Sequence, residues 1–234
     1  MREVEVDLDG HPGLVVRPRG ARALYVLAHG AGAGMRHAFM VDIATALAER
    51  AIATVRYEFP YMAAGRARTD APAIAEATVR AVWRAAAARY TDVPRFAGGK
   101  SFGGRMTSRA HAAEPLADVR GIVFLGFPLH APDKPGATAA ERTERRRASA
   151  AERSEHLARA SGPLLFLQGT RDELADLVLL RPVIRTLGAR ATLHVIEGAD
   201  HGFDVLVRSG TTRERVIDEL AATIAAWIAR MLDS

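Results

Sequence analysis

The 234-residue chain contains no cysteine. This absence excludes disulfide bonds, thiolate metal sites and a cysteine nucleophile. Long hydrophobic runs are missing as well, since no stretch reaches the roughly 18 consecutive apolar residues that a membrane-spanning helix requires. Residues 1–5 lack the basic and apolar regions of a signal peptide. We therefore expect a cytoplasmic protein that has no membrane partner.

Lysine is nearly absent too, because Lys100 and Lys134 are the only lysines of a chain whose formal charge is +5. A basic balance can indicate binding to nucleic acid, since basic surfaces attract phosphate. However, the densest group of arginines, in residues 142–153, is interleaved with glutamates and contains no aromatic residue that could stack on a base. The pattern favours a solvated helix face, so we expect no nucleic-acid partner.

What the sequence does contain is a regular alternation of strand-like and helix-like segments. Residues 4–8 and 14–18, separated by the turn-forming residues 10–13, predict an antiparallel hairpin. The apolar runs typical of strands buried on both faces of a parallel sheet are residues 23–28, 52–59, 94–98, 121–127, 163–169 and 192–198. Helical periodicity predicts helices over residues 37–50, 72–90, 103–113, 174–187 and 212–232.

This alternation predicts an α/β fold, in which helices cover both faces of a mainly parallel sheet. The chain length suits one hydrophobic core, so we expect a single domain over residues 1–234. Residues 131–161 depart from the pattern as a Pro/Gly-opened segment followed by an Arg/Glu-rich helix. This segment is either a short cap over a site at the sheet edge or a plain surface excursion.

Residues 99–103, Gly-Lys-Ser-Phe-Gly, fit the pattern G-x-S-x-G between a predicted strand and a predicted helix. In this context the serine lies in a strained turn that lifts its hydroxyl clear of the sheet. A hydroxyl becomes a good nucleophile only when a base accepts its proton. The pattern therefore indicates Ser101 as a nucleophile that requires a histidine.

The histidine and its acid should follow the serine along the chain in that fold context, acid first. His201 lies in a loop just beyond the last predicted strand, whereas His194 lies inside that strand, so we favour His201 as the base. Asp172 follows the preceding strand by a short turn and is the preferred acid, which fixes the imidazole tautomer. Asp176, one helical turn later, is the alternative.

The reaction also needs N–H groups that stabilise a developing oxyanion. Phe102, directly after the serine, supplies one, and we expect Ala31 in the small-residue loop 29–34 to supply the other. Part of that loop resembles a dinucleotide-binding G-x-G-x-x-G, but Met35 breaks the pattern. No histidine pair shows metal-ligand spacing, so we expect neither a cofactor nor a metal.

The substrate pocket is expected to be largely apolar and to suit a small or medium acyl group. The residues predicted to line it, besides Phe102, are Phe59, Tyr61, Met62, Leu129, His130 and Phe203. For His130 the sequence leaves two roles open, contact with substrate or a hydrogen bond within its own loop.

Over essentially its whole length the chain resembles the α/β-hydrolase superfamily, and most closely a small dienelactone-hydrolase-like branch of predicted bacterial hydrolases. The strings that carry the resemblance are LAHGAGAGM, FPYMAAGR, GGKSFGGRM, GFPLH, LFLQGTRD and GADHGF. The resemblance implies a three-layer α/β-hydrolase fold and a catalytic triad of Ser101, Asp172 and His201.

Dienelactone hydrolases usually carry cysteine where this chain has serine, which favours a general carboxylic ester or thioester as substrate. We expect a serine hydrolase that works through an acyl-enzyme and whose partner is this small molecule. The alternative is a catalytically silent binding or scaffold module on the same fold.

Overall fold

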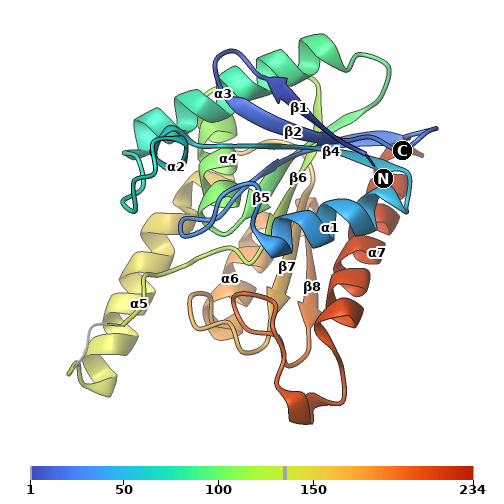
Figure 1. Ribbon diagram of the computed structural model, residues 1–234. Helices are drawn as coiled ribbons and strands as arrows, with labels where there is room; N and C mark the ends of the chain where they lie inside the picture. Colours follow the sequence, from blue (N-terminus) through green and yellow to red (C-terminus); the bar gives the residue numbers. More distant parts are fainter. Residues whose placement is uncertain (1, 134–135, 234) are drawn as a thin grey trace.

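The structure, a computed structural model, describes residues 2–133 and 136–233. Residues 1 and 234 of the predicted domain, and residues 134 and 135 of the predicted cap, lie outside the described residues. At the centre is an eight-stranded sheet with the order β1-β2-β4-β3-β5-β6-β7-β8 (Figure 1). The strands are β1 (Glu3–Asp7), β2 (Pro12–Val16), β3 (Ala23–Ala28), β4 (Ile52–Tyr57), β5 (Arg95–Lys100), β6 (Val119–Leu125), β7 (Leu164–Gly169) and β8 (Ala191–Ile196).

The pairing of the strands is mainly parallel, as the sequence predicts. Strands β1 and β2 form an antiparallel hairpin, and β2 pairs antiparallel with β4. All further neighbours from β4 to β8 run parallel. The carboxyl ends of β3 to β8 therefore meet at one edge of the sheet, where open parallel sheets bind their ligands.

Helices cover both faces of this sheet (Figure 1). One face carries α1 (Ala38–Ala48) and α7 (Arg213–Leu232), and the other carries α3 (Pro72–Arg89), α4 (Phe102–Ala113) and α6 (Leu177–Leu187). The sequence alternation of buried strands explains both layers, because successive side chains point to opposite faces.

Strand β3 shows the alternation. Tyr25 and Leu27 join the core cluster under α1 and α7, whereas Leu24 and Val26 join the cluster under α3 and α4. Both sets are buried, which is why the run carries no polar face. None of the helices over the described residues is long and apolar enough to cross a membrane.

The predicted helix over 174–187 begins later than expected, at Leu177. Asp176 is its N-cap, and its Oδ1 accepts a hydrogen bond from the Val178 N–H at 2.8 Å. Before the cap, the Leu174 N–H donates to Asp172 Oδ1 at 2.8 Å, which closes a turn instead of a helix. A short helix that the sequence analysis did not predict, α2 (Pro60–Ala63), follows β4.

The segment 131–161 contains helix α5 (Ala139–Ser154) and the short 3₁₀ helix η1 (Glu155–Ala158). Thr138 and Glu141 form a reciprocal capping box at the start of α5. Ala150 is the only buried residue of this helix. Helix α5 therefore runs along the surface as a mostly solvated element, beside the layer formed by α4 and α6 (Figure 1).

Candidate active site

Ser101 occupies a sharp turn between β5 and α4. Its backbone has φ 49° and ψ −114°, a conformation that non-glycine residues rarely adopt. A Cβ at Gly99 would lie 2.4 Å from the Ala28 carbonyl oxygen. A Cβ at Gly103 would lie 2.4 Å from the His29 carbonyl oxygen, so this turn can pack against β3 only with glycine at both positions. The turn lifts the Ser101 hydroxyl above the carboxyl edge of the sheet.

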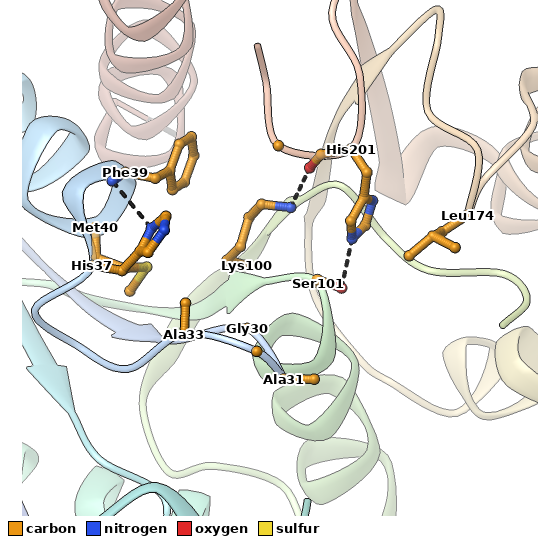
Figure 2. A pocket seen from close by; sticks show the side chains of 12 residues that line it. Gly30, Ala31, Ala33, His37, Phe39, Met40, Lys100, Ser101, Leu174 and His201 are labelled. Atoms are coloured by element: carbon orange, nitrogen blue, oxygen red, sulfur yellow. Dashed lines mark hydrogen bonds between the residues drawn. The ribbon is translucent and has the colours of Figure 1, made fainter. Parts of the chain in front are cut away.

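His201 contacts both Ser101 and Asp172. Its Nε2 lies 2.8 Å from Ser101 Oγ, the bond drawn in Figure 2, and its Nδ1 lies 2.7 Å from Asp172 Oδ2. Because an ionised carboxylate only accepts hydrogen bonds, we assign the imidazole proton to Nδ1. Nε2 is then free to accept the proton of the serine hydroxyl.

The Asp172 carboxylate is almost completely enclosed, with 1% of its side chain exposed. Burial raises its pKa, but the hydrogen bond and charge of His201 act in the opposite direction. The Leu174 N–H and the Lys100 ammonium add to that effect, so the pKa of Asp172 falls below its usual value. Gln168 Nε2 also donates to Oδ2, at 2.5 Å. Asp172 is therefore an ionised acceptor in a fixed orientation.

The two rival residues lie elsewhere. Asp176 caps α6, as described above. His194 Nε2 lies 2.8 Å from Glu219 Oε1, in a contact between β8 and α7. Neither Asp176 nor His194 has a hydrogen bond to Ser101 or His201 in the described part of the chain.

The loop 29–34 runs from β3 toward α1 beside the serine. A Cβ at Gly30 would lie 3.9 Å from Ser101 Cβ. The Phe102 N–H is at the first position of α4, where a helix supplies no acceptor. Among the described residues, the N–H groups of Phe102 and Ala31 donate no hydrogen bond. Both N–H groups are therefore free to donate to a further acceptor.

An apolar cavity of about 290 Å³ opens beside Ser101 (Figure 2). It is lined by Gly30, Ala31, Gly32, Ala33, His37, Phe39, Met40, Lys100, Ser101, Leu174, His201 and Gly202. Helix α1 thus supplies one wall, and the loop with the Ala31 N–H supplies another.

The six predicted pocket residues other than Phe102 do not line this cavity. Five of them, Phe59, Tyr61, Leu129, His130 and Phe203, are buried, and Met62 is partly buried. Their positions follow strands at the correct edge of the sheet, but their side chains turn inward. Sequence shows that a loop residue follows a strand, whereas burial decides whether its side chain faces the core or the cavity.

Several of these buried residues pack against residues that border the cavity or the serine. Phe59, Tyr61 and Met62 pack with Phe102 in the cluster under α3 and α4. Phe203 stacks on the cavity residue Phe39 with ring centroids 5.6 Å apart.

His130 keeps one of its two predicted roles. Its Nδ1 lies 3.0 Å from the carbonyl oxygen of Ala131, within its own loop. Its Nε2 is buried and has no hydrogen-bond partner in the described residues.

Lys100 is a site residue to which the sequence analysis assigned no role. Its ammonium donates to the His201 carbonyl oxygen (Figure 2) and lies 5.4 Å from the ring centre of Phe203. Burial lowers the pKa of Lys100 to about 8, although the charges of Asp172 and Asp200 oppose this shift. A signal was present, since one of only two lysines stands directly before the serine.

A second, charged depression of about 510 Å³ lies beside the apolar cavity. Leu174, His201 and Gly202 border both. Its charged lining is Asp133, Arg146, Arg171, Glu173 and Asp200. Arg146 belongs to α5 and pairs with Asp133 at 2.5 Å, so the segment 131–161 contributes a side chain next to the histidine.

Solved structures of known proteins share this fold. The chain superposes on a dienelactone hydrolase from Anabaena variabilis with a TM-score of 0.71 and 18% identity, over 98% of this chain and 97% of the other. For an α/β serine hydrolase without a lid from Xanthomonas campestris, the TM-score is 0.70 and the identity 20%, over 97% of this chain and 94% of the other. Est1E from Butyrivibrio proteoclasticus gives 0.69 and 16%, over 99% of both chains.

A family model provides the assignment that these low identities do not. The model, described as an alpha/beta hydrolase domain, matches residues 21–229. This range includes every strand of the parallel part of the sheet and the Ser101 turn. The three-layer fold predicted from the sequence is thereby confirmed, and the chain belongs to the alpha/beta hydrolase domain family.

Proposed function

We propose that this protein is a serine hydrolase that cleaves a small or medium carboxylic ester or thioester through an acyl-enzyme. Ser101 is the nucleophile, His201 the general base and Asp172 the residue that orients the base. The observation that carries the proposal is the continuous hydrogen-bonded chain from Ser101 Oγ to His201 at 2.8 Å and from His201 to Asp172 at 2.7 Å. It begins at a serine in a strained turn beside an apolar cavity.

In the acylation half of the reaction, Ser101 Oγ attacks the acyl carbon while its proton passes to His201 Nε2. The carbonyl oxygen becomes an oxyanion that accepts hydrogen bonds from the N–H groups of Ala31 and Phe102. The intermediate then expels the alcohol or thiol, which takes the proton from His201. Asp172 remains ionised throughout and stabilises the imidazolium that forms in between.

In the deacylation half, water replaces the leaving group. His201 accepts a proton from the water as its oxygen attacks the acyl carbon. When the bond to Ser101 Oγ breaks, His201 returns that proton to the serine. The products are the carboxylic acid and the free enzyme, so no cofactor or metal is required.

The two depressions suggest how a substrate divides between them. The apolar cavity, at about 290 Å³, suits a short or medium acyl chain. The charged depression borders the other side of His201, which donates the proton to the leaving group. We therefore place the leaving group there, beside Arg146 of the cap-like segment 131–161. Est1E has been solved with ferulic acid bound, and the reaction proposed here also releases a carboxylic acid.

A fluorophosphonate probe tests the proposal. We expect one adduct per chain, located on Ser101 by peptide mass spectrometry, and no adduct in Ser101→Ala. A series of p-nitrophenyl esters should show highest kcat/KM for short to medium chains, because a long chain exceeds the cavity. An unlabelled wild-type protein without esterase activity would support a silent binding module instead.

A further inference from the structure

The side chain of Tyr61 contacts the loop 29–34, which carries the Ala31 N–H, from the side opposite the cavity. Tyr61 is fully buried and belongs to the core cluster under α3 and α4. The cavity wall comes from Phe39 and Met40 of α1, which belong to the cluster on the other face of the sheet. The loop 29–34 passes between these two groups. The function proposed above does not use Tyr61.

The Tyr61 hydroxyl contacts two consecutive carbonyl groups of the loop. Its oxygen lies 3.2 Å from the Gly30 carbonyl oxygen and 3.0 Å from that of Ala31. The hydroxyl carries a single proton, which it donates to one carbonyl or shares between both. His29 Nδ1 lies 2.7 Å from the same Gly30 carbonyl oxygen, and it donates there because its Nε2 accepts the Phe59 N–H at 3.1 Å.

These contacts fix the direction of the next N–H groups. A trans peptide unit is planar, and its C=O and N–H point in opposite directions. If the Gly30 carbonyl points toward Tyr61, the Ala31 N–H points away from it. The next peptide unit behaves alike: because the Ala31 carbonyl also points toward Tyr61, the Gly32 N–H points away from it. Because the cavity lies on the side away from Tyr61, both N–H groups are directed toward the site of the oxyanion.

Tyr61 also contacts the second half of the oxyanion hole and is itself held firmly. Its ring meets the ring of Phe102 edge-on, with centroids 6.2 Å apart and an interplanar angle of 90°. The Tyr61 N–H donates to the buried carboxylate of Asp70 at 2.9 Å, and Arg66 pairs with that carboxylate at 2.8 Å. Burial, followed by the charges of Glu58 and Asp70, raises the pKa of Tyr61, so the hydroxyl stays a neutral donor at any assay pH.

We propose that Tyr61 is a positioning residue of the oxyanion hole, whose hydroxyl orients the peptide units that carry the Ala31 and Gly32 N–H groups. The inference rests on the proposed function, because it presupposes that an oxyanion forms at Ser101. Tyr61 does not touch the substrate. Its effect should therefore appear in the transition state and be small in the binding of an uncharged ground state.

The test compares Tyr61→Phe with Tyr25→Phe. Tyr25 is also fully buried and also donates to a backbone carbonyl, that of Val123 at 3.0 Å, but it lies in the sheet core. Loss of either hydroxyl should lower stability to a similar extent, because each variant removes one buried hydrogen bond. Only Tyr61→Phe should lower kcat, by about 10- to 100-fold, with KM within about twofold of wild type.

A pair of inhibitors separates orientation from packing. Ser101 Oγ attacks the carbonyl carbon of a trifluoromethyl ketone, and the serine proton passes to His201. The ketone oxygen of the resulting adduct is an oxyanion. The matching methyl ketone stays a ground-state ligand. In Tyr61→Phe the affinity of the first should fall by the same factor as kcat/KM, and that of the second should stay unchanged. Tyr61→Met, which also lacks the hydroxyl, should give the same ratio.

Three results would overturn the inference. One is an active Tyr61→Phe enzyme whose kcat and trifluoromethyl ketone affinity equal those of Tyr25→Phe. The second is an equal loss of affinity for both ketones, which would indicate a collapsed cavity. The third is normal kcat in Tyr61→Met. An inactive, unlabelled wild type would instead refute the proposed function, so the two failures are distinguishable.

Discussion

Among the described residues, two of the serine–histidine hydrogen bonds have the same length and opposite surroundings. Ser101 Oγ lies 2.8 Å from His201 Nε2 at the carboxyl edge of the sheet. Ser108 Oγ lies 2.8 Å from His156 Nε2, between α4 and η1. The distance between serine and histidine therefore does not distinguish the proposed catalytic pair from a structural one.

The direction of the hydrogen bond does. The Ser108 hydroxyl donates to the Arg105 carbonyl oxygen at 3.0 Å, so we assign the His156 proton to Nε2, which then donates to Ser108. In the other pair the His201 Nδ1–H donates a hydrogen bond to the ionised Asp172, so His201 Nε2 accepts a hydrogen bond from the serine hydroxyl. A histidine that donates to serine cannot accept the serine proton. The carboxylate partner thus leaves His201 Nε2 as an acceptor, which the proposed general base requires.

Access and charge differ as well. The His201 side chain is 24% exposed and borders the cavity, whereas His156 and Ser108 are buried. Burial, with the charges of Arg109, Arg105 and Arg159, lowers the pKa of His156 to about 3. His156 therefore stays neutral and inaccessible.

The largest effect should come from the two serines. Ser101→Ala should lower kcat/KM for an activated ester by about 10⁵- to 10⁶-fold, because the covalent route is lost. Ser108→Ala should keep activity within about twofold but lose about 1–3 kcal/mol of unfolding free energy, since the His156 N–H loses its acceptor. Steady-state kinetics and urea unfolding measure both quantities. Equal losses of activity in the two variants would contradict the assignment of Ser101 as nucleophile and Ser108 as a structural residue.

The next effect concerns the acid. Asp172→Asn presents an amide to His201 and favours the wrong tautomer, which leaves His201, like His156, without a carboxylate. We expect kcat to fall by about 10⁴-fold, the magnitude for the same change in serine proteases. Asp176→Asn is the matched control and should be nearly silent, because asparagine also caps a helix. A crippled Asp176→Asn enzyme would contradict our choice of acid.

The smallest effect is a pH dependence of stability. The native pKa of His156, about 3, lies below the value near 6.5 of an unfolded histidine. Between these values the unfolded chain binds a proton that the native protein does not. The contribution of His156 to stability is therefore fully present above about pH 6.5. As the pH decreases below that value, the free energy of unfolding decreases by up to about 1.4 kcal/mol per pH unit.

The variant His156→Gln should make that slope shallower, because glutamine keeps a donor for Ser108 and does not titrate. Urea unfolding at pH 7, 5.5 and 4.5 measures it. His11→Gln, which removes a histidine without a side-chain partner among the described residues, is the control. Identical slopes in wild type and His156→Gln would show that His156 is protonated in the native state.

Much of the fold could be predicted because its signals are local. Each predicted strand matches an observed one within two residues at either end, since buried parallel strands are short apolar runs between turns. The predicted start of α6 at residue 174 was wrong, because Asp172 and Asp176 are both suitable N-cap residues. In the structure Asp176 caps the helix, whereas Asp172 accepts hydrogen bonds of the candidate site and of a turn. Helix α2 was missed because four residues carry no periodicity.

The sequence by itself determined which residues reach the functional edge. Chain order and strand ends directed Ser101, Asp172, His201 and the loop around Ala31 to one place, because parallel strands must end together. The tertiary structure alone decided which way the neighbouring side chains point. The Tyr61 side chain turns inward and contacts the loop 29–34, whereas Phe39 and Met40 of α1 face the cavity and line one wall of it. That choice depends on burial against elements far away in the chain, which no local pattern records.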